Sequence, residues 1–415
     1  MPRAPPPAAA VAPPDPARRG RHRPWRITAI LCIAELLSMS GFATYPALLA
    51  QLRDLWGLSG AAAGFVGGSL FAGYMAAVPF LSGLTDRVDG RGVYAFAGGL
   101  AAAGAIAFAV LAQGVWSAAL CQAVVGAGLA GTYMPGLKLL TERIEGPRQS
   151  RHIAFYTSTF GFGTSASLLL ASQVEALAGW RWAFVVAGAG PLAAGLLVLW
   201  TLTAVPAAGG AAPPRLFEFR PVLQNREALR YIAGYAAHCW ELFGLRSWIV
   251  AFLVFSFSPA ESAPAAAAAV AAAINLLGAP ASILGNELAL RQRRRLIAVC
   301  MLLAAASACL VGFSAPLPAW AVTAALAIYF VFIMGDSASL TAGLIAATPP
   351  AQRGTTLALH SLLGFGAGFV APLVFGATLD AAGGPQRVLA WGIAFATLAG
   401  GYAAYLALLI AGRRR

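Results

Sequence analysis

Five ionisable side chains lie inside long apolar runs of this sequence, namely Glu35, His238, Glu241, Arg246 and Asp336. A charge at the centre of a lipid bilayer costs at least about 2.5–3.5 kcal/mol on insertion scales, so such a side chain usually faces a partner or a water-filled cavity. Burial also disfavours the charged form of a carboxyl group, which lets it bind and release a proton near neutral pH. These residues could therefore bind protons or form ion pairs within a membrane.

The strongest local pattern surrounds His238 and Glu241, which are three residues apart. At about 100° per residue their side chains lie about 60° apart on one helical face, so they could share a proton or a hydrogen bond. Trp248 falls about 20° from Glu241 two turns later and could form a stacking wall for a flat substrate. Arg246 is turned about 140° from Glu241, and a helix break at Gly244 could bring the two closer.

Two hypotheses account for these groups. In the first, Glu241 or Asp336 carries a coupled proton, with His238 as its partner. In the second, the same groups form a structural network that ties helices together without a transport role. The candidates for the solute- and proton-binding site are Glu35, His238, Glu241, Arg246, Trp248, Asp336, Tyr133 and Gln122.

The elements that carry these residues are apolar helices. The chain has 415 residues, of which 59% are hydrophobic and 10% charged, and its mean hydropathy is +0.74. Runs of about 20 apolar residues, enough to cross about 30 Å of hydrocarbon, recur along the sequence, whereas β-barrel strands would be half as long and alternating. We therefore predict an all-α polytopic membrane protein with twelve transmembrane helices, at 27–50, 59–81, 93–113, 115–138, 153–174, 181–203, 229–257, 262–285, 296–315, 317–345, 355–379 and 388–411.

The basic residues predict the orientation of these helices. Nearly all of the 28 lysines and arginines lie in the N-terminal tail, the even-numbered loops or the C-terminal end, while Arg53, Arg181 and Arg387 lie on the other side. Under the positive-inside rule both termini are cytoplasmic. The net charge of +13 is thereby explained without a nucleic-acid role. A single lysine, Lys138, among many arginines and alanines indicates a bacterial protein, and hence one of the inner membrane.

The chain divides into two related halves. A Pro-, Ala- and Arg-rich tail (1–26), predicted to be disordered, precedes a six-helix bundle at 27–203, a cytoplasmic linker at 204–228, a second bundle at 229–411 and a basic end at 412–415. Glu35-Leu36-Leu37 matches Glu241-Leu242-Phe243, and residues 158–163 match 361–366, at nearly equal offsets. Parallel repeats imply a pseudo-twofold axis along the membrane normal, with a solute site between the halves.

The loop after the second span carries the most specific motif. Residues 82–91 read SGLTDRVDGR and resemble the G-x-L-x-D-R-x-G-R-R signature of the major facilitator superfamily, with Ser82 in place of the first glycine and one extra residue before Gly90. The resemblance covers nearly the whole chain and implies two pseudo-symmetric six-helix bundles that rock about a central site. It also implies that Asp86, Arg87 and Arg91 help to lock the cytoplasmic gate, where Asp86 could pair with an arginine near a helix N-terminus.

The same resemblance also implies where the solute binds and which class of transporter this is. In this family the first, fourth, seventh and tenth spans line the cavity, and all five ionisable residues named above lie on that set. The fourth span is similar to the family's R-x-x-x-G-x-G segment, with Gln122 in place of the arginine, and residues 134–138 are weakly similar to the cyanate and nitrate branch. Residues 161–164 lack the proline of the drug antiporters. The resemblance therefore implies transport, with multidrug antiport disfavoured.

Together these features predict a secondary active transporter of a small organic solute, proton-coupled and monomeric in the bilayer, that works by alternating access. Two alternatives stay open: a transporter-like membrane sensor, and an anion transporter or exchanger without proton coupling. An anionic solute is possible if Arg246 faces the cavity unpaired. The sequence has no nucleotide-binding loop, its four histidines are scattered, and its five cysteines form no CxxC pair. We therefore expect no enzyme activity, no cofactor and no metal.

Overall fold

The computed structural model describes residues 24–85, 87–146, 148–205, 219–258, 260, 262–349 and 352–413, and none of these residues forms a strand. Most of the predicted disordered tail and residues 206–218 of the predicted linker lie outside these ranges. The first part consists of α1 (Pro24–Ser38), η2 (Met39–Gly41), α2 (Thr44–Leu55), α3 (Gly60–Leu84), α4 (Gly90–Leu111), α5 (Val115–Ala130), α6 (Tyr133–Thr141), α7 (Gln149–Ala178) and α8 (Trp180–Thr201). The second part consists of α9 (Arg220–Gln224), α10 (Arg226–Phe257), α11 (Ala263–Leu276), α12 (Gly278–Val311), η3 (Gly312–Ser314), α13 (Ala319–Gly335), α14 (Ser337–Ala346), α15 (Arg353–Ala381) and α16 (Val388–Arg413).

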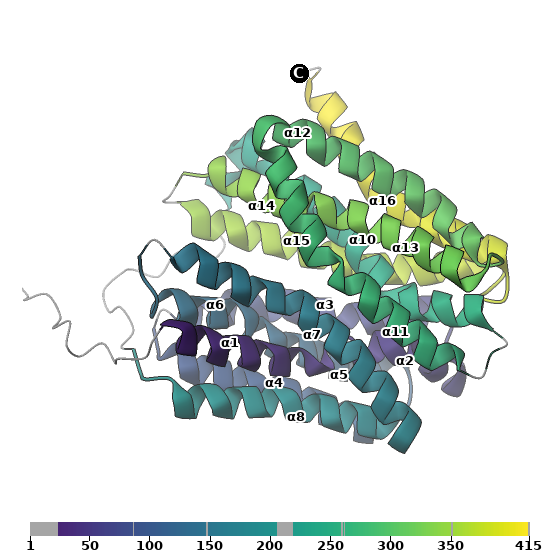
Figure 1. Cartoon of the computed structure of the whole chain (residues 1–415), viewed down its shortest axis with the longest axis horizontal. Helices are drawn as coiled ribbons and strands as arrows, with labels where there is room; N and C mark the ends of the chain where they lie inside the picture. Colours follow the sequence, from purple (N-terminus) through teal and green to yellow (C-terminus); the bar gives the residue numbers. More distant parts are fainter. Residues whose placement is uncertain are drawn as a thin grey trace, which may run out of the picture.

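The helices form two bundles that lie one against the other (Figure 1). In the first bundle, α1 to α8, the helix α3 packs on α5 and α4 packs on α8; in the second, α10 to α16, the helix α10 packs on α15 and α16. Small residues allow this close packing, since a Cβ added at Gly126 of α5 would lie 2.7 Å from the carbonyl carbon of Leu70 on α3. Close contact through glycine is how helices associate where lipid removes the hydrophobic driving force.

Among the described residues, ten helical segments are long and apolar enough to cross a membrane, which confirms the prediction of an all-helical polytopic membrane protein. One of them, Ala263–Ser314, has 52 residues, more than one crossing needs, and its backbone leaves helical geometry at Gln292 (φ −142°, ψ 58°). The helix α7, with 30 residues, is not among the ten; it carries many Ser and Thr side chains, which bond to carbonyls of their own helix, as Thr164 Oγ1 does to Phe160 O (2.9 Å). The count of twelve spans stays a prediction.

Several of the predicted spans are broken within the bundles. The first span passes from α1 to α2 through the 3-10 turn η2, and the tenth breaks at Asp336, between α13 and α14. The helix α10 is not broken: it runs from Arg226 to Phe257, so the break predicted at Gly244 is wrong. Gly244 instead makes room for the side chain of Leu398 on α16, which an added Cβ would strike.

The two bundles meet backbone to backbone along α3 and α15. Gly60, Gly64 and Gly68 lie four residues apart and so form one face of α3, which packs on the α15 backbone. Asp380 of α15 accepts hydrogen bonds from the backbone N–H groups of Gly60 (2.7 Å) and Ala61 (2.9 Å), which have no intrahelical partner at the start of α3. We call this contact, made by residues 60–68 of α3 and 369–380 of α15, the closed end.

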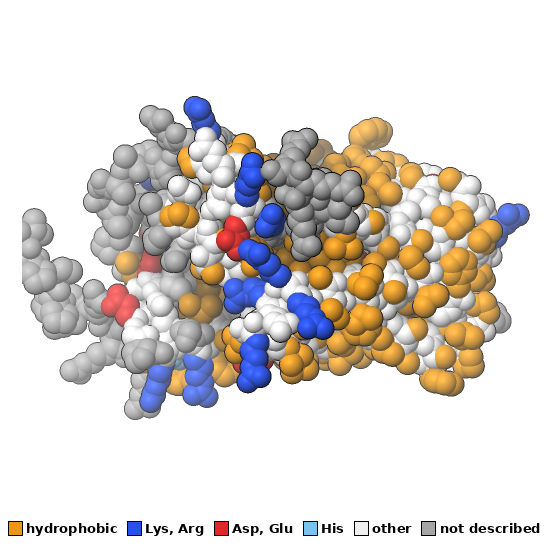
Figure 2. All heavy atoms as spheres, turned by 90° about the horizontal axis from the view of Figure 1, so that it is seen from above, with side chains coloured by type: hydrophobic (Ala, Val, Ile, Leu, Met, Phe, Trp, Pro, Cys, Tyr) orange, Lys and Arg blue, Asp and Glu red, His pale blue; other side chains and the backbone are white. Residues whose placement is uncertain are grey.

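The outer surface is apolar over most of its extent. Large side chains such as Phe80, Trp116 and Trp320 are more than half exposed. Figure 2 shows hydrophobic side chains over the right-hand part of the face drawn, with most of the Lys and Arg side chains farther left, toward the end at which α12 bends in Figure 1. We call this the basic end; at α12 it carries Arg291, Arg293, Arg294 and Arg295. An apolar belt with basic residues at one border is what a lipid bilayer favours.

Candidate functional site

A cavity lies between the two bundles. The first bundle contributes Gly67 of α3, Gln122 of α5 and Thr164 of α7, and the second contributes Arg246 of α10 and Asn275 of α11. We call it the Arg246 cavity. A cavity lined from both bundles is the arrangement that lets a rocking motion expose a bound solute to either side.

A second cavity adjoins the first. Phe42, Leu70 and Phe71 line both cavities and form a shared wall. The polar lining of the second cavity includes Glu35 of α1 and Tyr133 of α6. We call it the Glu35 cavity.

The Arg246 side chain is 9% exposed and is held in place by one neutral partner. Its Nε donates a hydrogen bond to Asn275 Oδ1 (3.0 Å), and Asn275 Nδ2 donates to Ala271 O (2.9 Å), which fixes the direction of the amide. The guanidinium carbon lies 5.6 Å from the ring centre of Phe160 and 5.8 Å from that of Phe330, within reach of cation–π attraction. In the described part of the chain no carboxylate forms an ion pair with Arg246.

Glu35 is fully buried and faces its cavity with part of its carboxyl group unbonded. Ser38 Oγ and Tyr156 OH each lie 3.2 Å from Glu35 Oε2, while Oε1 has no hydrogen-bond partner among the described residues. The Tyr156 hydroxyl also lies 2.8 Å from the carbonyl oxygen of Tyr133, which can only accept. Because one hydroxyl proton serves one acceptor well, a bond from Tyr156 to Tyr133 leaves room for a protonated Glu35 to donate to the hydroxyl oxygen.

Tyr156 is a site residue that sequence reasoning missed. It lies inside the predicted span 153–174 beside a basic loop. An aromatic residue at such a position is typical of the membrane interface. No local signal separates it from packing tyrosines, because its role depends on the approach of α7 to the break between α5 and α6.

His238 and Glu241 contact different partners rather than each other. His238 Nδ1 lies 2.8 Å from Asp336 Oδ1, a distance at which a protonated imidazole would form an ion pair with the carboxylate. Glu241 Oε1 accepts a hydrogen bond from Tyr329 OH (2.7 Å). His238, Glu241 and Asp336 are 0–1% exposed and line neither of the two cavities described above.

Trp248 does not occupy the place predicted for it. Its indole is fully buried within the second bundle, where Nε1 donates a hydrogen bond to Pro372 O (3.0 Å) and the ring stacks on Phe375. It therefore packs α10 against α15 and is no stacking wall for a solute in either cavity. Gln122 and Tyr133, by contrast, line the Arg246 cavity and the Glu35 cavity respectively.

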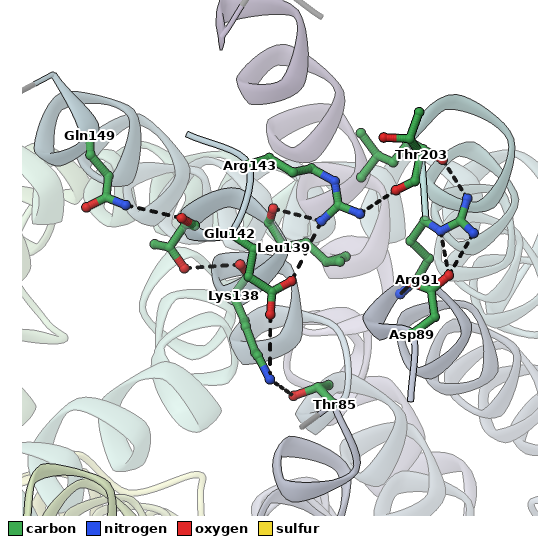
Figure 3. Close-up of polar contacts among 11 residues, drawn as sticks. Thr85, Asp89, Arg91, Lys138, Leu139, Glu142, Arg143, Gln149 and Thr203 are labelled. Carbon is green, nitrogen blue, oxygen red and sulfur yellow. Dashed lines mark hydrogen bonds and ion pairs between the residues drawn. The ribbon is translucent and has the colours of Figure 1, made fainter. Parts of the chain in front are cut away.

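The predicted gating loop forms a polar network within the first bundle (Figure 3). Arg91 pairs with Asp89 (Nη2 to Oδ2, 2.7 Å) and donates through Nη1 to Leu202 O (2.6 Å), so it caps the C-terminal end of α8. Asp89 also accepts from the Arg91 backbone N–H and caps α4. Partial burial works against the charged form of Asp89, but hydrogen bonds from Arg91 and nearby positive charge hold its pKa below its ordinary value. Arg87 is exposed, and Asp86 lies outside the described residues.

Comparison with known proteins identifies the fold. The Major Facilitator Superfamily profile matches residues 31–372. No curated protein sequence matches the chain. A bacterial homologue of the human lysosomal transporter Spinster, in an inward-facing and unoccupied conformation, superposes with a TM-score of 0.73 at 17% identity, over 94% of this chain and 95% of that one.

Two other solved structures have the same fold. A mutant of the nucleoside transporter NupG superposes with a TM-score of 0.74 at 14% identity, over 93% of this chain and 99% of that one. A POT family transporter in complex with 5-aminolevulinic acid superposes with a TM-score of 0.72 at 12% identity, over 93% of this chain and 96% of that one. At these identities the likeness shows the fold alone. The family match, which spans most of the chain, shows more: the protein belongs to the Major Facilitator Superfamily and is a membrane transporter rather than an enzyme.

Proposed function

We propose that the protein moves a small organic solute across the membrane by alternating access, coupled to protons through Glu35. The observation that carries the proposal is that ionisable side chains from both bundles, Glu35 and Arg246, line adjoining cavities between them. Buried ionisable groups are expensive in a membrane and usually mark a solute or proton pathway where they face a cavity. In this proposal, rocking of the bundles separates α3 from α15 at the closed end and exposes the cavities to that side.

Glu35 is better placed for proton exchange than Glu241 or Asp336. Glu35 lines a cavity, whereas the other two carboxyl groups line neither cavity and are enclosed by the second bundle against Tyr329 and His238. In this proposal Glu241 and Asp336 hold α10 to α13 and α14, the structural role of the second hypothesis above.

The proposal also includes the membrane, the orientation and the oligomeric state of the protein. It places the chain in a bacterial inner membrane as a monomer, with both termini in the cytoplasm and no nucleic-acid partner. The basic end would face the cytoplasm under the positive-inside rule. The closed end, which lies away from the basic end, would then face the outer side.

Uptake into proteoliposomes tests the proposal. A panel of labelled organic acids, amino acids, sugars and nucleosides is offered to the reconstituted protein, with and without an imposed pH gradient. We expect the gradient to drive accumulation of at least one solute, and Glu35→Gln to abolish that accumulation while leaving exchange across equal pH. Glu227→Gln, at a half-exposed carboxyl paired with Arg294, is the matched control and should behave like the unsubstituted protein. Uptake by the unsubstituted protein that ignores the gradient would refute the coupling.

A further inference from the structure

Arg246 is a buried cation without an anionic partner in the described part of the chain. Glu241, the nearest acid on its own helix, lies about 140° around the helix axis and is bonded to Tyr329. Asp336 is occupied by His238. Asn275 accepts a hydrogen bond from the Arg246 Nε–H only. No hydrogen bond joins the terminal nitrogens Nη1 and Nη2 to a described residue, and the Arg246 side chain lines the Arg246 cavity.

A guanidinium in this position is suited to a planar anion. Its two terminal nitrogens form a fork that matches a carboxylate or phosphate in two parallel hydrogen bonds. The rings of Phe160 and Phe330 favour the cation while the site is empty, but they cannot accept those hydrogen bonds. A buried charge left without a counter-charge is costly, and a ligand that supplies one removes that cost.

A second polar group faces the same space. Gln122 of α5 is 2% exposed and lines the Arg246 cavity, and its Oε1 has no hydrogen-bond partner among the described residues. Gln122 comes from the first bundle and Arg246 from the second. A solute held by both would therefore bridge the two bundles.

We infer that the transported solute carries a carboxylate or phosphate group, which binds the terminal nitrogens of Arg246, while Gln122 bonds a polar group of the same solute. This inference rests on the proposed function and names the chemical class of the solute. Asn275 is a positioning residue, because it holds Nε and thereby aims the fork into the cavity.

Ligand-induced shifts in melting temperature of the purified full-length protein test the inference. The probes are matched pairs that differ in charge: benzoate and benzamide, succinate and succinamide, glycerol 3-phosphate and glycerol. We expect only anionic members to bind. Arg246→Gln should weaken the best anion at least thirtyfold, about 2 kcal/mol at 1.4 kcal/mol per tenfold, and Arg246→Lys should retain part of the affinity. Asn275→Ala should weaken it less than Arg246→Gln does.

The control removes the same charge elsewhere. Arg181→Gln changes an exposed arginine that packs on Trp180, and it should bind the anion like the unsubstituted protein. The inference is overturned if neutral members bind as well as their anions, if Arg246→Gln binds like the unsubstituted protein, or if no anion of the panel binds. Anion binding without uptake would refute the transport proposal alone, and uptake of only neutral solutes would refute the inference alone.

Discussion

Replacing Gly64 by alanine should loosen the closed end. An added Cβ would lie 2.6 Å from the carbonyl carbon of Pro372 and 2.9 Å from Leu373 Cα. Non-bonded carbon atoms settle about 3.5–4.0 Å apart, and both obstacles are backbone atoms that cannot rotate away, so α3 and α15 must separate by about 1 Å at this level. Overpacking of this kind costs about 1–3 kcal/mol, which changes the ratio of two conformations about 5- to 150-fold.

Amide hydrogen exchange of the full-length protein in lipid nanodiscs measures this change. The N–H groups of Gly60 and Ala61 are bonded to Asp380 only while the closed end holds, so their exchange should accelerate by that ratio. Gly99→Ala is the matched control, because apart from the adjoining backbone of α4 itself no atom lies within 4 Å of a Cβ added at this position. Unchanged exchange at Gly60 and Ala61 in Gly64→Ala would show that the two helices are not held together at this point.

Three further perturbations test other contacts. Asp380→Asn should weaken the contact at the start of α3 by about 0.3–1 kcal/mol and speed the same amide exchange, because it removes a negative charge from the positive N-terminal end of the helix. His238→Ala should destabilise the fold by about 1–3 kcal/mol in denaturant unfolding, since it leaves the buried Asp336 carboxyl group without its close polar partner, and Asp336→Asn in the same chain should recover part of the loss. The pKa of Asp89 is held below its ordinary value by Arg91, so the charged carboxylate adds stability that is present above about pH 4 and lost as the pH falls through the lowered pKa. Asp89→Asn should remove that step from unfolding measured across pH.

The helical membrane fold could be predicted because the length of an apolar run is a local property of the sequence. Whether the helix breaks at Gly244 could not be predicted, because a glycine can either weaken a helix or allow a neighbouring side chain to approach it closely. Here the choice depends on Leu398 of α16, far along the chain. The break at Asp336 likewise could not be predicted, because no proline next to it signals a break in the helix.

The residues of the site could be identified in part, but their partners could not. Periodicity correctly placed His238 and Glu241 on one side of α10, and both contact the tenth predicted span. His238 contacts Asp336, whereas Glu241 contacts Tyr329, seven residues earlier in the same predicted span. Which residue each one meets is set by the register of the two helices. Sequence spacing within one helix carries no information on that register.

Proton binding in the Glu35 cavity and anion binding in the Arg246 cavity should be coupled. Glu35 and Arg246 come from different bundles, and Phe160 contacts both sites. Its ring centre is 5.6 Å from the Arg246 guanidinium carbon, and the residue also lines the Glu35 cavity. In an interior of low dielectric, a charged Glu35 would repel an anion bound at Arg246. A proton on Glu35 therefore favours anion binding, and by linkage the anion favours the proton to the same degree.

This coupling makes the pH dependence of anion affinity a measurable signature. When the pH is lowered from about 8 to about 6, the affinity of the unsubstituted protein for its best anionic probe should rise, because a proton on Glu35 would remove the charge that repels the anion. Glu35→Gln, which resembles the protonated acid, should bind tightly and equally at both pH values. If Glu35→Gln keeps the rise, the coupled proton resides on another group, with Glu241 and Asp336 the next to substitute. Since proton and anion each favour the other on the same carrier, they should cross the membrane in the same direction.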